Sequence, residues 1–538
     1  MAEPKEECQP AATSNHHEDA MITATQNGQG VSGYEELSPW ETIKKFWVNS
    51  LLCFAVTFSA ATDGYQMGLT GNIIANAGFV QQFGTQTIDD GSVVLASSVL
   101  STWGALQSVG QVFGMVTLPF LSDRFGRKVA MYYYWLIISL AVVVEIVARQ
   151  WQVWLVAKIL AGIGVGCLQS TIPTYISEIA PTRVRGTFLM CYSFWWIVGQ
   201  FFAPVALQVL HEQDPKDYLT ALYTQWSQVG LMLLIYVFLP ESPAWLASKG
   251  KAQLAKKSLR TLYRGVEGFD VDHQYSLIVL NLEREREVAA DQRSEKWWAI
   301  FKGRDGLRTL ISCWTLMTQQ FIGLGVFFGF GTYFWQQAGI PDPFVVTCIT
   351  SGINIVASVV VIYLADYTGR RGLSCVGTTV CWLCTVVIGI LGVVKRTGAT
   401  NHITVLFACF WNIGLIANAA TGWGFIGEIS SQRLRPYTAG FAAGSTACVG
   451  TVMGVLVPYM TNANEWNWGL KTGWFFAGVG LPFTIAMWFL IPETSGRSAA
   501  ELDELFERNI KPWQFHKATT ATQRVILEAS SKAVSAHA

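Results

Sequence analysis

The stretch that decides the fold is "LSDRFGRK" at residues 121–128, because the chain repeats it as "LADYTGRR" at residues 364–371, 243 positions later. Two further pairs recur at almost the same spacing: "ISEIAPTRVRG" (176–186) with "IGEISSQRLRP" (426–436), and "PESP" (240–243) with "PETS" (492–495). Matched features at a nearly constant offset indicate an internal duplication. The sequence therefore predicts two halves of the same design.

Long uncharged windows predict membrane helices. The chain is 51% hydrophobic and only 14% charged, whereas a soluble protein carries about 25% charged residues. Asp, Glu, Lys and Arg are absent from windows long enough to cross a bilayer of about 30 Å as helices: 91–122, 187–211, 218–240, 310–341, 343–365, 372–394, 403–427, 436–464 and 472–492. Three more apolar segments hold one charge each: 46–70 with Asp63, 129–148 with Glu145, and 151–177 with Lys158. We predict an all-α membrane protein with twelve transmembrane helices in two pseudo-symmetric six-helix halves.

The charged stretches mark the expected domain boundaries. They are a disordered N-terminal tail (1–45), the N-terminal half (46–240), a linker with short helices (241–308), the C-terminal half (309–491) and a C-terminal tail (492–538). Basic residues concentrate in the loops after even-numbered spans: Arg124, Arg127, Lys128, Arg183, Arg185, Arg370, Arg371, Arg433 and Arg435. The positive-inside rule then puts these loops, the linker and both termini in the cytoplasm, although Lys395 and Arg396 fall on the other side. We expect a multi-pass protein of the plasma membrane.

Several other classes of function receive no support from the sequence. No G-x-x-x-x-G-K-[ST] phosphate-binding loop occurs, so we do not expect ATP to drive the protein. Cys381 and Cys384 have the spacing of a metal or redox pair, but no second pair accompanies them, which favours simple packing. We therefore expect no enzymatic activity, cofactor, metal or nucleic-acid partner, and a monomer whose partners are a small solute, the lipid bilayer and possible protons.

The duplicated loops predict a conformational latch. Parallel six-span repeats place a solute between the halves near the bilayer midplane, with access alternating as the halves rock. Basic and acidic residues at the ends of the spans can pair in one access state only. The latch candidates are Asp123, Arg124, Gly126, Arg127, Glu178 and Arg185 in the first half and Asp366, Arg370, Glu428 and Arg435 in the second. The alternative is that these loops only fix the topology.

Together these motifs resemble the sugar porter family of the major facilitator superfamily, over about residues 45–510. Besides the two loops, "PESPAWL" matches a family motif, with Ala244 in place of the family's Arg. A "QQxxG" motif on the seventh span is matched by Gln319, Gln320 and Gly323, and "PETSGRSAAELDELFE" matches the ending after the twelfth span. "YFWQQAGI", "GEISSQRLR", "EWNWGLKTGWFFAG" and "ELFERNIKPWQF" are more narrowly similar to fungal α-glucoside (maltose-type) proton symporters. The resemblance implies the major facilitator fold and transport of a sugar or sugar-like solute.

The resemblance also implies solute-binding residues. Gln319, Gln320 and Asn354 match amides that bond sugar hydroxyls, and Trp423 matches a residue that packs on the sugar ring. Gln66 and Ser193 stand at two further such positions, with Ser193 in place of a Gln. The alternative for the amides is bonding between helices, and for Trp423 ordinary packing. Gly325, Thr446 and Gly450 stand where the family often has Asn, which predicts a roomier site for a larger or less hydroxyl-rich solute.

Asp63 is the remaining candidate for proton coupling. Gln66 replaces the carboxylate that many proton-coupled members use, and Lys158 replaces its usual Arg partner. The α-glucoside branch has two further carboxylates; one is matched by Asp63, whereas the other falls at Gln111. Asp63 and Lys158 lie at a similar depth and could pair, with Glu145 as a rival partner. Either Asp63 carries a proton, or an Asp63–Lys158 pair is static and transport is passive.

The function predicted from the sequence is secondary active transport of a sugar or sugar-like solute (an α-glucoside, hexose or polyol) by alternating access, coupled to protons. Three alternatives stay open: a passive facilitator, an exporter of a small metabolite, which the loss of amides would favour, and a nutrient receptor that does not transport. Such receptors tend to have long cytosolic extensions, whereas the tail here is short.

Overall fold

The structure is a computed structural model that describes residues 38–87, 91, 93–266, 268–294, 296–431, 434–462, 464–495 and 499–518. Residues 1–37 of the tail that we predicted to be disordered lie outside these ranges. Residues 39–45, which we assigned to the same tail, form the helix α2 (Pro39–Lys45). A capping box of Ser38 and Glu41 begins this helix, because each side chain bonds the backbone N–H of the other residue.

In the described residues, ten helices are long and apolar enough to cross a membrane. In the first half they are α6 (Ser97–Phe125), α7 (Arg127–Val147), α8 (Trp151–Ile179), α9 (Arg185–Gln213) and α10 (Leu219–Phe238). In the second half they are α16 (Pro343–Thr368), α17 (Arg370–Leu391), α18 (Gly398–Ile429), α19 (Arg435–Thr461) and α20 (Thr472–Leu490).

The two remaining spans are interrupted, and they are the first span of each half. The first is α3 (Trp47–Thr57) followed by α4 (Ser59–Ile73). The seventh is α14 (Gly303–Phe321), a π-helical segment η3 (Gly325–Gly329) and α15 (Gly331–Gln337). Gly323, between α14 and η3, has φ +100°, which a residue with a side chain rarely adopts. With these two interrupted spans the protein has the predicted twelve.

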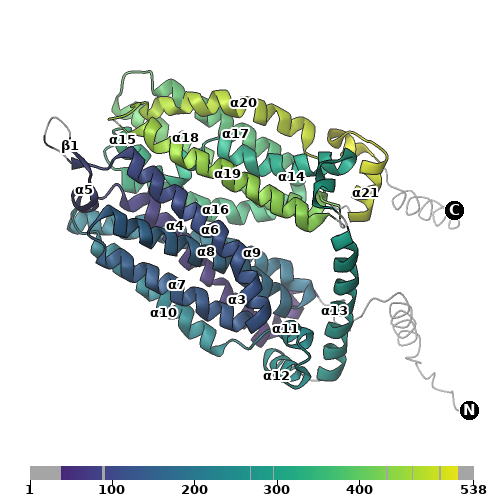
Figure 1. The fold of residues 1–538 in the computed structure, drawn as a ribbon. Coiled ribbons are helices and arrows are strands. Elements are labelled where there is room, and N and C mark those ends of the chain that lie inside the picture. Colours follow the sequence, from purple (N-terminus) through teal and green to yellow (C-terminus); the bar gives the residue numbers. More distant parts are fainter. Residues whose placement is uncertain are drawn as a thin grey trace, which may run out of the picture.

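The same helix pairings build both halves. Four contacts in the first half each have a counterpart in the second. The contact of α4 with α9 corresponds to that of α14 with α19, and α6 with α8 corresponds to α16 with α18. Likewise α7 with α8 corresponds to α17 with α18, and α7 with α10 corresponds to α17 with α20. The first half, purple to blue in Figure 1, lies beside the second half, green to yellow. This repetition confirms the two pseudo-symmetric halves that the duplicated motifs predict.

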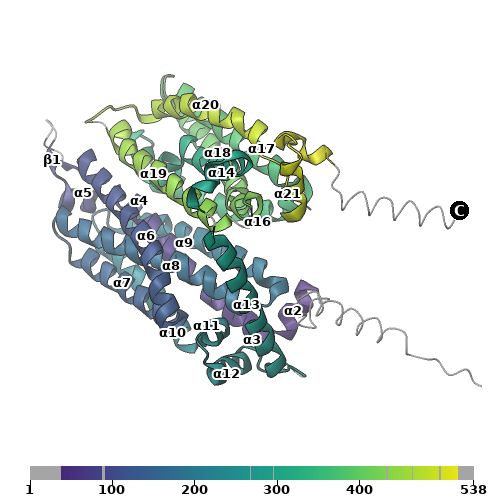
Figure 2. The same ribbon diagram turned by 45° about the vertical axis from the view of Figure 1, so that its right-hand side comes forward.

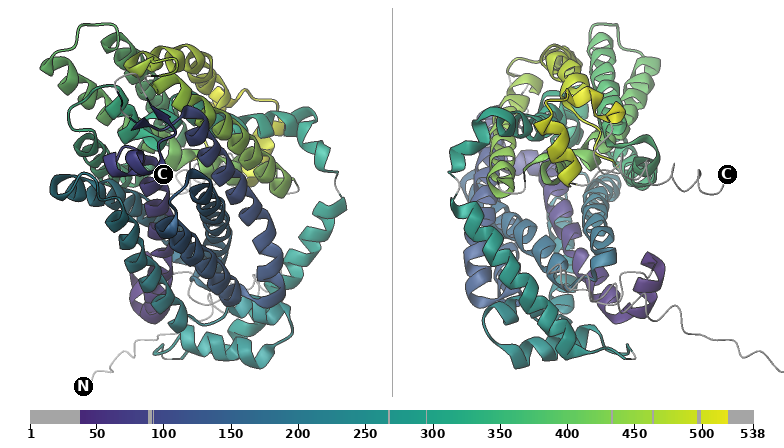
Figure 3. Two further views of the ribbon diagram at one scale, coloured as in Figure 1. Left: turned by 60° about the vertical axis from the view of Figure 1, so that its left-hand side comes forward. Right: turned by 90° about the vertical axis from the view of Figure 1, so that its right-hand side faces the viewer.

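The bundle has two distinct ends (Figures 1 and 2). The "motif end" has the two duplicated loops, the linker and the C-terminal helices, namely α11 (Pro243–Ser248), α12 (Ala252–Leu262), α13 (Val271–Ser294), η2 (Trp297–Phe301), α21 (Ala499–Glu507) and η5 (Pro512–Lys517). The "hairpin end" has α5 (Ala77–Phe83), the antiparallel strands β1 (Gln86–Thr87) and β2 (Val93–Val94), and η4 (Gly469–Lys471). At the motif end, α13 runs from the first half towards the second (Figure 3).

The apolar core joins the two halves at the hairpin end. One buried cluster there combines Phe79, Trp103 and Trp154 of the first half with Tyr333 and Phe344 of the second. No buried residue of the other three large clusters, as described, comes from the opposite half, although the linker adds Leu262 to one and the C-terminal helices add Leu502, Leu505, Phe506 and Phe515 to another. The halves therefore share packing at the hairpin end, while each has its own core towards the motif end.

Candidate functional site

Hydrogen bonds between α6 and α19 hold the hairpin end closed. Ser97 Oγ donates to the carbonyl of Pro458 at 3.3 Å, and Ser101 Oγ donates to that of Val455 at 2.8 Å. Asn462, just after α19, donates from Nδ2 to Ser97 Oγ at 2.9 Å. These bonds join helices of opposite halves, so they must break before the halves can part at this end.

The interrupted spans α4 and α15 make a second contact between the halves. Thr332 Oγ1 lies 2.6 Å from Asn72 Oδ1, to which it donates. Beside this bond the backbones approach so closely that a Cβ added at Gly71 would lie 2.0 Å from the carbonyl oxygen of Gly329. A side chain at Gly71 would therefore push the halves apart. The described contacts between the halves lie at the hairpin end or near the middle of the bundle, and they indicate a state that is closed at the hairpin end.

Each duplicated loop at the motif end turns at a glycine that packs on a carboxylate. Gly126 has φ +115° and Gly369 has φ +75°, and this region is open to few residues besides Gly. A Cβ at Gly126 would lie 2.4 Å from Glu241 Oε2, and one at Gly369 would lie 2.5 Å from Glu493 Oε2. The backbone conformation therefore requires glycine, and a side chain here would also displace the carboxylate.

Glu241 and Glu493 cap the helices that follow these glycines. The first two backbone N–H groups of α7 donate to Glu241 at 3.0 and 3.1 Å, and those of α17 donate to Glu493 at 3.0 and 3.2 Å. A carboxylate is stabilised at this position by the free N–H groups and the helix dipole. Burial raises the pKa of the Glu241 carboxyl above its usual value, against the opposing effect of these backbone bonds. We had given neither residue a role, although the repeated Pro-Glu pair was a visible signal.

The structure brings three of the predicted latch residues together. Arg127 Nη2 bonds Glu178 Oε1 at 2.8 Å, and its Nη1 bonds Asp123 Oδ1 at 2.5 Å. Arg185 is exposed, and in the described part of the chain Glu178 pairs with Arg127 and not with Arg185. Arg124 lies over the ring of Phe125 at 5.6 Å instead of joining the group. The ion pairs of Arg127 therefore link the loop before α7 to the motif end of α8.

The second copy of the latch is described only in part. Arg370 donates its backbone N–H to Glu493, and Arg435 is half-buried at the start of α19. The side chains of Asp366 and Glu428 lie outside the described residues, and so does that of Trp423. Their roles stay predictions.

The predicted solute amides differ in how fully they are bonded. Gln319 donates from Nε2 to Asn418 Oδ1 at 2.9 Å, and Asn418 donates to Thr378 Oγ1 at 2.5 Å. This chain ties α14, α18 and α17 together within the second half, which is the alternative role we considered for Gln319. Gln320 is half-buried, and a Cβ at Gly450 would lie 3.3 Å from its Nε2. Gly450 therefore packs closely on Gln320, at a position where related proteins often have Asn.

Asn354 and Ser193 differ in how far they are buried. Asn354 is buried in α16, and its Oδ1 has no hydrogen-bond partner among the described residues. Ser193 is exposed on α9. Buried polar atoms without partners are rare in folded proteins, so the free Oδ1 of Asn354 is consistent with a solute contact.

A closed polar network surrounds Glu145, and it corrects one expectation. Lys158 does not pair with Asp63; its Nζ bonds Glu145 Oε1 at 2.8 Å, so the rival partner was right. Glu145 also accepts from Gln66 Nε2 at 2.6 Å and from Gln225 Nε2 at 2.8 Å. The network joins α4, α7, α8 and α10, and it satisfies a buried ion pair with additional hydrogen bonds. Gln66 thus donates to the protein itself, while its Oε1 has no hydrogen-bond partner among the described residues.

Asp63 stands apart from this network. It is 0% exposed, and its Oδ2 accepts a 2.7 Å hydrogen bond from Gln169 Nε2. Gln169 in turn accepts a hydrogen bond from Gln111 Nε2 at 2.8 Å. Gln111 stands where related symporters have a carboxylate, and through Gln169 it is connected to Asp63. Asp63 Oδ1 has no hydrogen-bond partner among the described residues. No described cation pairs with Asp63.

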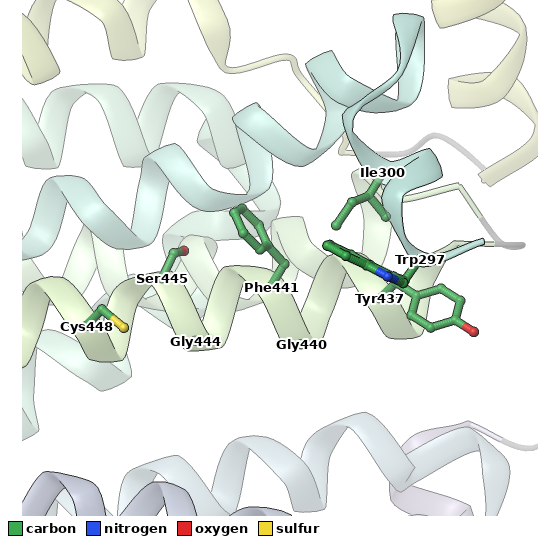
Figure 4. A pocket seen from close by; sticks show the side chains of 8 residues that line it. All are labelled: Trp297, Ile300, Tyr437, Gly440, Phe441, Gly444, Ser445 and Cys448. Atoms are coloured by element: carbon green, nitrogen blue, oxygen red, sulfur yellow. The ribbon is translucent and has the colours of Figure 1, made fainter. Parts of the chain in front are cut away.

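A cavity at the motif end contains none of the predicted solute residues. It measures about 530 Å³ and lies between η2 and one face of α19 (Figure 4). Its lining comprises Trp297, Ile300, Tyr437, Gly440, Phe441, Gly444, Ser445 and Cys448. This lining is mainly apolar and belongs to the linker and the second half.

Two six-helix halves, joined at one end and each tied by polar networks inside the membrane, define a membrane transporter of the major facilitator fold. The profile of the family described as "Sugar (and other) transporter" matches residues 52–506, so the chain belongs to this family. It is therefore a transporter and not an enzyme.

Curated relatives match over most of their length. The chain is 28% identical over 537 residues to the MFS transporter fmqE of Aspergillus fumigatus, covering 96% of this chain and 98% of that protein. It is 26% identical over 498 residues to the hexose transporter HXT10 of Saccharomyces cerevisiae, covering 88% of each. It is 27% identical over 489 residues to the general alpha-glucoside permease of the same yeast, covering 88% and 78%.

Solved structures share the fold. The inward-open xylose transporter XylE of E. coli superimposes with a TM-score of 0.68 at 19% identity, over 85% of this chain and 99% of that one. The proton:xylose symporter XylE bound to 6-bromo-6-deoxy-D-glucose gives a TM-score of 0.62 at 20% identity, over 85% and 100%. The predicted major facilitator fold is confirmed.

Proposed function

We propose that this protein moves a sugar or sugar-like solute across the plasma membrane by alternating access, and that it couples this movement to protons through Asp63. The observation that carries the proposal is the isolation of Asp63: a wholly buried carboxylate that has, among the described residues, no hydrogen-bond partner at Oδ1 and no paired cation. A lone carboxylate in a membrane interior is costly, and such residues commonly mark ion or proton pathways.

The Glu145–Lys158 pair supports this assignment, because the passive alternative rested on a static pair of Asp63 with Lys158. If Asp63 neutralised Lys158, its carboxylate would be a fixed counter-ion. Glu145 already performs that role with three donors around it. Asp63 can therefore gain and lose a proton without leaving a buried cation unpaired.

The solute class rests on polar groups that related proteins use for sugars. Asn354 Oδ1 has no hydrogen-bond partner among the described residues, and Gln320 lies against Gly450, where related proteins often have Asn. Amides that can both donate and accept suit a solute rich in hydroxyls. The similarity to an alpha-glucoside permease and a hexose transporter favours an α-glucoside or a hexose. The small residues Gly325 and Gly450, at positions where related proteins often have Asn, favour the larger α-glucoside.

The orientation of the protein is part of the same proposal. Basic residues at the motif end put it in the cytoplasm with both termini, and the domain boundaries 46–240 and 309–491 delimit the two moving halves. The state closed at the hairpin end is then the inward-facing one. In this scheme Arg127, Asp123 and Glu178 act at the cytosolic face.

Uptake into proteoliposomes tests the proposal. Labelled maltose, glucose, a polyol and an organic acid are offered to the purified protein, with an imposed pH gradient and with or without a protonophore. We expect accumulation of at least one sugar that the protonophore abolishes. Binding without uptake would indicate a receptor, and uptake that ignores both the gradient and the protonophore would indicate a passive carrier.

A further inference from the structure

Trp196 of α9 joins the two halves of the protein close to Asp63. Its ring stacks on Phe328 of η3, with ring centroids 5.9 Å apart and an angle of 18° between the planes. Trp196 belongs to the first half and Phe328 to the interrupted seventh span of the second. The stack therefore depends on the relative position of the halves, unlike the packing inside either half.

The same tryptophan lies against Asp63. Helices α4 and α9 touch through glycines: a Cβ at Gly64 would lie 2.0 Å from the carbonyl oxygen of Trp196, and one at Gly199 would lie 2.0 Å from that of Ala61. From this closely packed helix the Trp196 side chain also lies within reach of the Asp63 carboxylate. No completed hydrogen bond reaches Asp63 Oδ1 in the described residues. A donor and an unsatisfied acceptor thus lie next to each other.

We propose that Trp196 transmits the protonation state of Asp63 to the contact between the halves. An ionised Asp63 accepts the indole N–H at Oδ1, because hydrogen bonds to a charged acceptor are about twice as strong as neutral ones. This bond draws the ring towards α4 and away from Phe328. A protonated Asp63 releases the ring to stack on Phe328, which is the arrangement in the present structure. Trp196 is thus a positioning residue, and the proposal rests on the proton coupling proposed above.

The surroundings of Asp63 support a single titrating group at this contact. Two described polar groups face Asp63 itself, Gln169 of α8 and Tyr192 of α9. One turn away along α4, Gln66 bonds Glu145 of α7, which pairs with Lys158 of α8, and Ser59 bonds Tyr236 of α10. The other elements packed on α4, namely α3, α15 and η3, contain no charged residue. Glu145 and Lys158 neutralise each other, so Asp63 provides the change of charge.

The neighbouring Trp195 is a matched control. Its ring packs on Phe54 and Phe58 of its own half, at 5.8 and 5.3 Å between centroids. Its Nε1 is buried and has no hydrogen-bond partner in the described residues. Trp195→Phe therefore removes the same N–H from the same helix without affecting Asp63 or the second half.

The test compares Trp196→Phe, Trp195→Phe and wild type in proteoliposomes, using a sugar that the wild type accumulates. Trp196→Phe retains a ring that can stack but loses the N–H donor. We expect its downhill exchange to stay within about twofold of wild type, while its accumulation and its pH dependence are lost. Trp195→Phe should keep both. Phe328→Leu removes the stack from the other side and should also lose accumulation, which provides a second variant should Trp196→Phe not fold.

Two results would overturn the inference, and they can be told apart. If the wild type is driven by the pH gradient and Trp196→Phe is driven equally well with the same pH profile, Trp196 has no coupling role. If the wild type itself ignores the gradient, the proposed proton coupling is wrong and this inference fails with it.

Discussion

Lys158 and Glu145 form a buried ion pair inside the first half, with 2.8 Å between Lys158 Nζ and Glu145 Oε1. Lys158 also donates to Thr70 Oγ1 at 2.9 Å and lies 4.4 Å from the centre of the Trp154 ring. The pair gives each of these two buried charges a partner inside the first half, and the proposed proton coupling therefore uses Asp63 instead.

This pair should be important for stability. Glu145→Gln leaves Lys158 buried without a counter-ion, and breaking such a pair costs about 3–5 kcal/mol. We expect a large fall in thermal stability in detergent, recovered in part by adding Lys158→Met, because neither member of the pair is then charged. Asp272→Asn breaks the exposed Lys256–Asp272 pair and should change the melting temperature little. Equal stability of Glu145→Gln and wild type would contradict the proposed role of the pair.

The Arg127 cluster should control the rate of conformational exchange more than solute binding. Arg127→Ala removes the bonds to Glu178 and Asp123 far from the solute residues. A loss of about 1–2 kcal/mol of charge-assisted bonding corresponds to a roughly 5- to 30-fold change in the balance between states. We expect a matching fall in turnover with little change in solute affinity, measured by transport and by equilibrium binding.

Lys249→Ala is the control for Arg127, because Lys249 is an exposed residue at the same end. It should transport at the wild-type rate. If Arg127→Ala also does so, the loops serve topology alone. Arg370→Ala should behave like Arg127→Ala if the two halves are functional copies.

Gly126 and Gly369 should not tolerate a side chain. At Gly126 an alanine meets both a backbone conformation with φ +115° and an oxygen 2.4 Å from its Cβ, and unfavourable backbone of this kind costs about 1–3 kcal/mol. We expect Gly126→Ala and Gly369→Ala to lower the melting temperature and to loosen the Glu241 and Glu493 caps. Gly186, whose Cβ would meet nothing within 4 Å, is the control. A Gly126→Ala protein as stable as Gly186→Ala would show that the cap adapts.

The contact between Gly450 and Gln320 should determine which solute binds. Gln320→Ala should weaken solute binding by roughly 5- to 30-fold, as expected for about 1–2 kcal/mol of hydrogen bonding. Gly450→Asn adds an amide and reduces the space beside Gln320. We expect its preference to shift from a disaccharide towards a hexose in competition uptake. An unchanged ratio would remove Gly450 and Gln320 from the solute site.

Much of the fold could be predicted from the sequence, because a membrane span needs about 20 apolar residues and such windows are visible in it. The interruptions of the first and seventh spans could not. The break at Phe58 has no Pro or Gly beside it to signal it, whereas Gly323 and Gly325 gave a local hint for the seventh span. A window of apolar residues shows that a span is long enough to cross the membrane, but not that its helix is continuous.

The sequence predicted how deep the site residues lie in the membrane, but not towards which neighbour each helix turns them. The sequence placed Asp63, Glu145 and Lys158 at similar depths, yet depth does not say which face of a helix meets its neighbour. The orientation of α7 makes Glu145, and not Asp63, the partner of Lys158. This orientation follows from the packing of the helices. Glu241 and Glu493 were visible as repeated residues, but their role as caps follows from the turn at each loop glycine, which the sequence does not fix.

Asp63→Asn tests the central claim most directly. In proteoliposomes, a gradient of about one pH unit holds about 1.36 kcal/mol per proton, enough for roughly tenfold accumulation with one coupled proton. Asparagine is similar in size and keeps a hydrogen-bonding side chain, but it cannot take up and release a proton. The account predicts that wild type accumulates its sugar under this gradient, whereas Asp63→Asn only equilibrates it, at a downhill exchange rate close to wild type. Accumulation by Asp63→Asn to the wild-type level would contradict the account.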